Sequence, residues 1–207
     1  MAAAALRPGG EALITVRPAN EAGWDDLRAV FGTRGPAATC WCQRYKLARG
    51  EAFKHHPAAV RADRLREQAG CGGSGPTSGL VAYADGEPVG WCAVEPRPAY
   101  DGLVRNSSRA AWVGREEDRT DPGVWAVTCV LVRTGHRRQG VGRALAAAAV
   151  DFARERGARA LEAYPMTTVE TALLEELHVG TADMFAAAGL AEVHRPSLRR
   201  AVYRADF

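Results

Sequence analysis

The sequence predicts one α/β domain built on a sheet with mixed strand directions. Its 207 residues are enough for one sizeable core, and strand-like and helix-like segments alternate along the chain without an internal repeat. Two alternating apolar runs are joined by Asp85-Gly86, a dipeptide typical of a hairpin between antiparallel strands. Residues 124–132 are apolar on both faces, as expected of a central strand that is buried between two layers.

The first elements follow from local patterns. Residues 1–11 are expected to be a flexible tail, which leaves residues 12–207 as the domain. The alternating segment 12–19 predicts a first strand. Asn20 is placed to cap a helix over residues 21–31, where the large apolar residues share one face.

The middle of the chain predicts one helix, one hairpin and two irregular stretches. Residues 32–50 have no period and carry aromatics. A helix is expected over 56–70, with a proline near its start and a glycine at its end. A short glycine-rich link leads to the hairpin at 80–97. Residues 98–123 predict a long surface excursion, and loops of such length are often functional.

The last third begins with the central strand at 124–132. Apolar residues then recur at helical spacing from Val141 until Gly157, which is placed to end a helix. The remaining segments predict, in order, a strand at 160–165, a short helix at 169–177, a helix at 181–190 and a closing pair of strands at 191–195 and 200–207.

Composition disfavours several classes of protein. An apolar content of 47% and a charged content of 25% are those of an ordinary soluble protein. No apolar run approaches the roughly 20 residues that span a bilayer, and the N-terminus is too short in apolar residues for a secretory signal, so we expect a cytoplasmic protein without a membrane partner. A net charge of +3 is too small to indicate nucleic acid. Cys40 and Cys42 form a C-x-C with no second pair, so we interpret the five cysteines as buried thiols and expect no metal.

The turn between the central strand and the following helix predicts an anion site. Gly140 and Gly142 lie where the helix should begin, and Arg137, Arg138 and Arg143 surround them. A helix N-terminus carries unpaired N–H groups and a partial positive charge, and glycines allow close approach of a ligand. The pattern fails both the P-loop and the dinucleotide fingerprint. The alternative interpretation is an ordinary helix start with solvated arginines.

"RRQGVG" at residues 137–142 matches the [RQ]-x-x-G-x-[GA] pyrophosphate motif of the GNAT superfamily of N-acetyltransferases. Residues 124–165 resemble the strand, turn, helix and strand around that motif, and "MFAAAGL" at 184–190 resembles its late helix. The resemblance covers about residues 13–207, and "CWCQRY" and "EAYP" are similar to a little-characterised bacterial branch. It implies a sheet of about six to seven strands, splayed between the fourth and fifth and flanked by helices.

The resemblance also implies acetyl-CoA as co-substrate and direct transfer of its acetyl group to the amine of a small molecule. By that resemblance the backbone of Val130, Leu131 and Val132 would bind the pantetheine arm. The pyrophosphate would be held by the turn and the first residues of the helix, namely Arg137, Arg138, Gln139, Gly140, Val141, Gly142 and Arg143. The chain is expected to act as a monomer or a homodimer.

The sequence departs from the family pattern at the catalytic acid. Phe185 stands where the superfamily often has a tyrosine that protonates the thiolate. Tyr164, at the end of a strand, is the candidate acid, with packing against a helix as the alternative. Glu95 is the candidate base, with an ion pair to Arg97 or Arg61 as the alternative.

The acceptor pocket is expected between the first two helices, the loop after Arg97 and the last hairpin. Its aromatics are Trp41, Tyr45, Trp91, Tyr100 and Trp112, and its candidate anion-binding residues are Arg44, Arg97 and Arg105. Cys129 is interpreted as core. A non-catalytic CoA- or acyl-CoA-binding regulator remains the alternative function, and the sequence leaves the acceptor and the length of the acyl group open.

Overall fold

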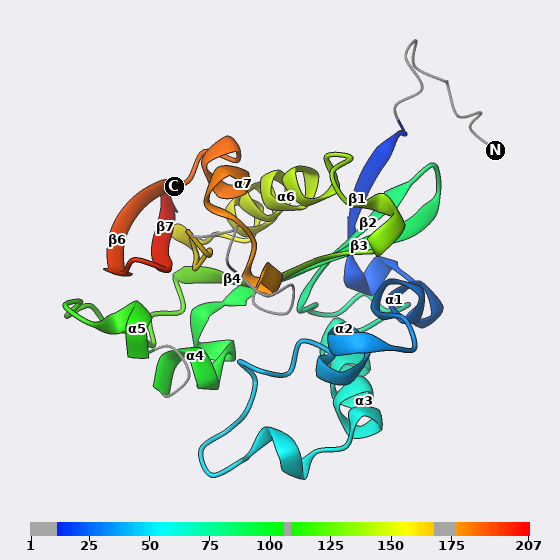
Figure 1. Cartoon of the computed structure of the whole chain (residues 1–207), viewed down its shortest axis with the longest axis horizontal. Helices are drawn as coiled ribbons and strands as arrows, with labels where there is room; N and C mark the ends of the chain where they lie inside the picture. Colours follow the sequence, from blue (N-terminus) through cyan, green and yellow to red (C-terminus); the bar gives the residue numbers. More distant parts are fainter. Residues whose placement is uncertain (1–11, 106–108, 168–176) are drawn as a thin grey trace.

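A computed structural model describes residues 12–105, 109–167 and 177–207. Seven strands form one sheet in the order β1-β2-β3-β4-β5-β7-β6 (Figure 1). The strands are β1 (Ile14–Pro18), β2 (Gly79–Ala84), β3 (Glu87–Pro96), β4 (Val124–Val132), β5 (Ala160–Ala163), β6 (Ala191–Ser197) and β7 (Arg200–Asp206). β4 and β5 run parallel, and the other neighbours are antiparallel. The single α/β domain with a mixed sheet is therefore confirmed.

The sheet splits in the middle of β4. Its parallel pairing with β5 ends at Val127, opposite Ala163, although β4 continues to Val132. On the other side, Val94 pairs with Val127 and Ala93 with Cys129, so Thr128 is an extra, bulged residue. Bulges bend a strand and occur often beside active sites. The bulge and the end of the β5 pairing coincide, which confirms a sheet that is splayed between its fourth and fifth strands.

Helices cover both faces of the sheet (Figure 1). α6 (Val141–Glu155) and α7 (Ala182–Ala187) lie on one face, where α6 packs on the inner strands through an apolar cluster that includes Leu145 and Ala149. On the other face lie α1 (Trp24–Phe31), α2 (Gly35–Cys40), α3 (Ala58–Ala69), α4 (Asp101–Arg105) and α5 (Arg109–Trp112). Short 3-10 turns complete the chain at Ala19–Glu21, Phe53–His55, Arg97–Ala99, Thr134–His136 and Leu177–Val179.

Most predicted elements are present at the expected places, including the hairpin turn, where Asp85 and Gly86 adopt positive φ values of 49° and 87°. Asn20 is not the cap of α1. Gly23 is the N-cap residue instead, and its backbone N–H donates a hydrogen bond to Asp26 Oδ2 at 3.1 Å. The predicted tail at 1–11 and most of the predicted helix at 169–177 lie outside the described residues.

The prediction of a surface excursion at residues 98–123 is wrong. This segment contains α4 and α5, and it buries Tyr100, Leu103 and Trp112 against Ala126 of β4. Its apolar residues are too irregularly spaced to show a helical period, yet together they form a third apolar cluster on the sheet. The segment therefore forms part of the wall beside the bulge.

In the part of the chain that the structure describes, no helix is both long and apolar enough to cross a membrane. The same residues contain no group of three His, Cys, Asp or Glu side chains that is arranged to hold a metal ion.

Candidate active site

The N-terminus of α6 is open to solvent and has no side-chain cap. Gly140 precedes the helix with φ 85°, and Arg138 also adopts a left-handed backbone with φ 61°. The first N–H groups of an α-helix have no partner within the helix. Arg138, Gly140 and Arg143 are exposed, whereas Val141 is buried and holds the helix on the sheet. The turn therefore presents backbone donors and positive charge together, which suits a phosphate group.

The two glycines of this turn also have packing roles. A Cβ on Gly142 would lie 3.1 Å from Met184 Sδ of α7, and one on Gly140 would lie 3.6 Å from Ile14 Cδ1 of β1. A side chain at position 142 would crowd α7, so a substitution there tests packing as well as ligand binding. Reversal of the exposed Arg143 charge avoids this ambiguity.

Among the described residues, the second half of β4 has no strand partner on the side of β5. Arg133 N donates to Val89 O at 2.9 Å, so the backbone of Arg133 faces β3. Because alternate residues of a strand face opposite neighbours, the backbone groups of Val132 and Val130 face away from β3, where β5 no longer pairs. Arg137 Nε donates to the carbonyl oxygen of Val132 at 3.2 Å and joins this edge to the turn. These residues fit an extended ligand that runs along β4 and ends in a phosphate.

Glu95 pairs with Ala126 of β4, which is two residues before the bulged Thr128. The side chain of Glu95 lies on the face of the sheet that α1 to α5 cover. Its carboxylate accepts a hydrogen bond from Lys46, and both side chains are largely buried. Burial raises the pKa of Glu95 above its ordinary value, although Lys46 opposes the shift. A carboxylate with a raised pKa is a stronger base, so the environment suits proton removal.

The alternative ion pairs predicted for Glu95 are not those in the structure. Arg97 pairs with Glu117 and Glu162. Arg61 donates instead to backbone carbonyls, including that of Thr39 at 2.7 Å. Glu95 is therefore paired with a lysine that sequence reasoning missed. The signal was present, since Lys46 is one of only two lysines in a chain rich in arginine.

Tyr100 lies beside this carboxylate. Its side chain is fully buried, and the Lys46 ammonium lies 4.6 Å from the centre of its ring. Its hydroxyl lies near Glu95 and Thr128 and interacts with both, although neither contact has the geometry of an ordinary hydrogen bond. Burial, reinforced by the charge of Glu95 and opposed by nearby Thr128, raises the pKa of Tyr100 well above its ordinary value. A neutral donor without a good partner thus lies between Glu95 and the bulge.

Tyr164 is buried at the end of β5 and has a partner. Its hydroxyl donates to Glu162 Oε2 at 2.8 Å, and burial with the charge of Glu162 raises the pKa of Tyr164 well above its ordinary value. A role as the acid that protonates the thiolate would require this hydroxyl to leave Glu162. Phe185 is buried on the opposite face of the sheet, in the α6 cluster.

The other residues predicted to line the acceptor pocket lie in the core or at the surface. Trp41 stacks on Phe31 with ring centres 4.8 Å apart, and Trp91 is buried beside them, so both belong to the core. Cys129 also packs in that core, as expected. Arg105 is paired with Asp101, whereas Arg44 is exposed.

The fold and this geometry define a class of protein: an α/β domain with a split sheet and an uncapped, arginine-rich helix N-terminus beside the split. The family model described as "Acetyltransferase (GNAT) family" matches residues 41–176, well over half of the chain. The chain therefore belongs to the GNAT family of acetyltransferases, and it is an acyltransferase of the N-acetyltransferase type.

Solved structures share the fold at low sequence identity. A GCN5-related N-acetyltransferase from Kribbella flavida is 18% identical with a TM-score of 0.51, and the match covers 94% of this chain and 98% of that one. A GNAT-family acetyltransferase from Streptococcus pneumoniae is 11% identical with a TM-score of 0.52, covering 94% and 100%. The yncA protein from Salmonella typhimurium, solved "with its cofactor Acetyl-CoA", is 14% identical with a TM-score of 0.50, covering 93% of each chain. No curated protein sequence matches the chain significantly.

Proposed function

We propose that the protein transfers the acetyl group of acetyl-CoA to the amine of a small molecule, by direct attack of the amine within a ternary complex. The observation that carries the proposal is the coincidence of three features at one place. The bulge at Thr128, the open edge of Val130–Val132 and the uncapped start of α6 follow one another along the chain. Each is suited to one part of an acyl-CoA: its reacting end, its extended arm and its pyrophosphate.

The residues that would hold the donor are those of β4 and the turn. The backbone groups of Val130 and Val132, which face the split, would bind the extended arm, whereas the backbone of Leu131 faces β3, where Leu131 pairs with Trp91. Backbone N–H groups from Arg138 to Arg143 would bind the pyrophosphate, and the exposed arginines would neutralise its charge. Acetyl-CoA supplies an acetyl thioester, whose carbonyl carbon is open to attack by an amine.

Glu95 is the proposed base. It lies on the face of the sheet opposite α6, near the bulge, and its raised pKa makes it a competent proton acceptor. The carboxylate of Glu95 already forms an ion pair with the ammonium group of Lys46, so it is suited to bind a cationic nitrogen of a substrate. A protonated acceptor amine would compete with Lys46 for Glu95 and lose its proton there before attack.

Two tyrosines are candidates for the donor that stabilises the leaving thiolate. The sequence-based candidate, Tyr164, must give up its hydrogen bond to Glu162 to serve. Tyr100 has no good partner to give up, and it lies beside Glu95. We therefore favour Tyr100 as the donor and keep Tyr164 as the alternative.

The proposal is tested by release of CoA thiol from acetyl-CoA in the presence of a panel of small primary amines. We expect amine-dependent thiol release, with a mass increase of one acetyl group on at least one amine. Glu95→Gln should slow this release without weakening acetyl-CoA binding, since Glu95 lies away from the turn. Tight acetyl-CoA binding without thiol release across a broad panel would contradict the proposal and favour the CoA-binding regulator, the function that Phe185 suggested.

A further inference from the structure

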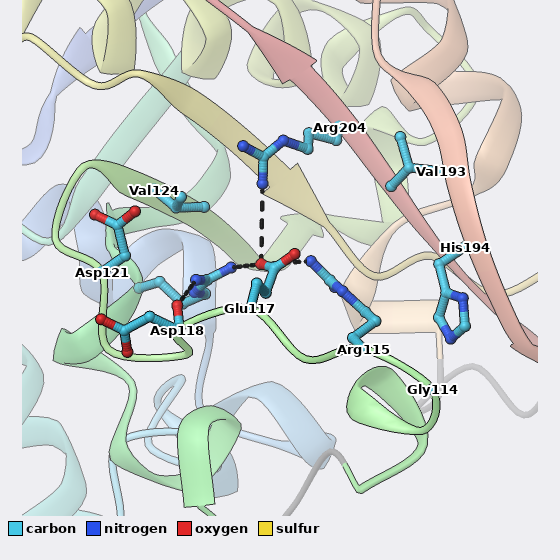
Figure 2. A pocket seen from close by; sticks show the side chains of 10 residues that line it. Gly114, Arg115, Glu117, Asp118, Asp121, Val124, Val193, His194 and Arg204 are labelled. Atoms are coloured by element: carbon cyan, nitrogen blue, oxygen red, sulfur yellow. Dashed lines mark hydrogen bonds and ion pairs between the residues drawn. The ribbon is translucent and has the colours of Figure 1, made fainter.

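A second charged site lies at the other end of β4. A pocket of about 400 Å³ opens beside Val124 and is lined by side chains from β6, β7 and the loop that follows α5 (Figure 2). Its most prominent members are Arg97, Arg115, Arg204 and Glu117. Figure 2 shows the Glu117 carboxylate between the guanidinium groups of Arg115 and Arg204.

One oxygen of Glu117 contacts all three arginines. Glu117 Oε1 lies 2.8 Å from Arg97 Nη1, 2.7 Å from Arg115 Nη2 and 4.0 Å from Arg204 Nη1. The arginines are held from behind by Glu162, which is fully buried and accepts hydrogen bonds from each of them. Each guanidinium group therefore has a carboxylate partner besides Glu117.

Three guanidinium groups share the buried carboxylate of Glu162, and Arg204 also pairs with Asp206, so one positive charge is left for Glu117. Asp118 and Asp121 also line the pocket, but their carboxylates bind Thr120 and Arg159.

Two of the three arginines of this pocket are buried, whereas Glu117 is partly exposed. Arg97 and Arg115 have side chains only 1% and 8% exposed, whereas that of Glu117 is 38% exposed. Glu117 also lies outside any helix or strand, in the loop between α5 and β4. The cationic half of the site is largely buried, and the anionic half is on the surface.

We propose that this pocket is a binding site for a small carboxylate ligand, and that Glu117 occupies the position of the ligand's carboxylate when the ligand is absent. A carboxylate accepts paired hydrogen bonds from guanidinium groups with good geometry, so a second carboxylate can replace the first without loss of partners. The side chain of Glu117 is a single carboxylate on a two-carbon arm, and a short aliphatic acid such as glutarate contains this group.

The pocket opens at the start of β4, away from the turn that is proposed to bind acetyl-CoA. Val124 lines the pocket, and the bulge at Thr128 lies four positions further along β4, about 13 Å away at the usual rise of a strand. Tyr164 and Trp112 pack in the cluster between them. Glu162, which holds the arginines, pairs with Ala126, as Glu95 does, so the arginine cluster lies two strands from the proposed base, about 10 Å away at the usual spacing of strands.

The test is a calorimetric titration of the full chain with glutarate at constant ionic strength, with the uncharged glutaramide as control. Glu117→Gln keeps the shape of the side chain and removes the competing charge, so we expect glutarate to bind at least about tenfold more tightly than to wild type. Glu116→Gln, at the exposed neighbouring position, is the matched control and should equal wild type. Inorganic phosphate, titrated in parallel, distinguishes a carboxylate site from a general anion site.

Absence of saturable glutarate binding to Glu117→Gln would overturn the proposal, as would an equal gain in Glu116→Gln or tighter binding of phosphate than of glutarate. Circular dichroism at 25 °C checks the fold of each variant. Loss of the fold in Glu117→Gln would also overturn the proposal, because Glu117 would then be a structural counter-ion for the arginines.

Discussion

Single side chains around the bulge account for the proposed chemistry. Lys46, Glu95 and Tyr100 come from three separate segments, and none of the three predicts the others by spacing in the sequence. Their meeting gives Glu95 a raised pKa and a cationic neighbour, while Tyr100 keeps a buried hydroxyl without a good partner. Groups with perturbed pKa values in a cluster of this kind often mark functional sites.

Replacement of Glu95 by Gln should change the pH dependence of kcat/KM. A base must be ionised, and the raised pKa of Glu95 puts the acid limb of the wild-type profile above the ordinary range of a glutamate. The ratio of wild type to Glu95→Gln should be largest near neutral pH, where the amine is protonated, and should shrink as pH rises toward the amine's own pKa. The measurement is kcat/KM for both proteins from roughly pH 6 to 9. A constant ratio over that range rules out Glu95 as the base.

The two buried tyrosines should behave oppositely when changed to Phe. Tyr100→Phe removes a hydroxyl without a good partner, so the free energy of unfolding should not fall, while kcat falls by about 10²-fold if the hydroxyl acts on the thiolate. Tyr164→Phe removes a hydrogen bond to a buried carboxylate and should cost about 1.5–3 kcal/mol of stability, with little change in kcat. Urea unfolding and steady-state kinetics on both variants decide which tyrosine donates the proton. The reverse pattern in kcat would restore Tyr164 as the acid.

At the scale of elements, α6 and β3 fit together through a glycine. A Cβ on Gly90 would lie 2.9 Å from Val141 Cγ1 and 3.0 Å from Leu145 Cδ1, so Gly90 lets the first turns of α6 lie close to the sheet. Gly90→Ala should therefore lower the free energy of unfolding by about 1–3 kcal/mol, the usual cost of overpacking. Gly75→Ala, at an exposed position with no atom within 4 Å of the added Cβ, is the control and should change stability by less than about 0.5 kcal/mol. Equal stability of the two variants would contradict this account of the α6 packing.

The elements that the sequence predicts well are those with strong local signals. The Asp85-Gly86 turn, the apolar run of β4 and the glycines at the start of α6 each depend on neighbouring residues alone, and each has its expected conformation. The cap of α1 was predicted wrongly because Asn20 lies within the 3-10 turn Ala19–Glu21. The helix begins after Gly23, whose backbone N–H donates to Asp26.

Contacts between distant segments explain the rest of what the sequence does not predict. α4 and α5 are short helices, stabilised by burial of Tyr100 and Trp112 on the sheet rather than by a helical period. The partner of Glu95 comes from Lys46, and the partners of Glu162 come from three separate segments. In the candidate site, the conformation of the turn before α6 could therefore be predicted from local sequence, whereas the surroundings of Glu95, Tyr100 and Tyr164 could not.

At the scale of the whole molecule, the split in the sheet divides two functions between two faces. In the proposed mechanism, the start of α6 and the edge of β4 bind acetyl-CoA, and the opposite face supplies Glu95 as the base and Tyr100 as the proton donor to the thiolate. The two substrates would meet through the split, where the sheet has no hydrogen bonds to break. This arrangement requires that the donor binds at the start of α6, so this requirement is the central claim.

A calorimetric titration of acetyl-CoA tests this claim most directly, on wild type, Arg143→Glu and the control Arg154→Glu. Arg154 is an exposed arginine of the same helix, about 16 Å further along its axis. A glutamate in the first turn favours the helix dipole, so Arg143→Glu should remain folded. We predict that acetyl-CoA binds wild type and Arg154→Glu with affinities within a few-fold, and binds Arg143→Glu at least about tenfold more weakly. Equal affinity of Arg143→Glu and wild type would contradict the account, because the pyrophosphate would then lie away from the start of α6.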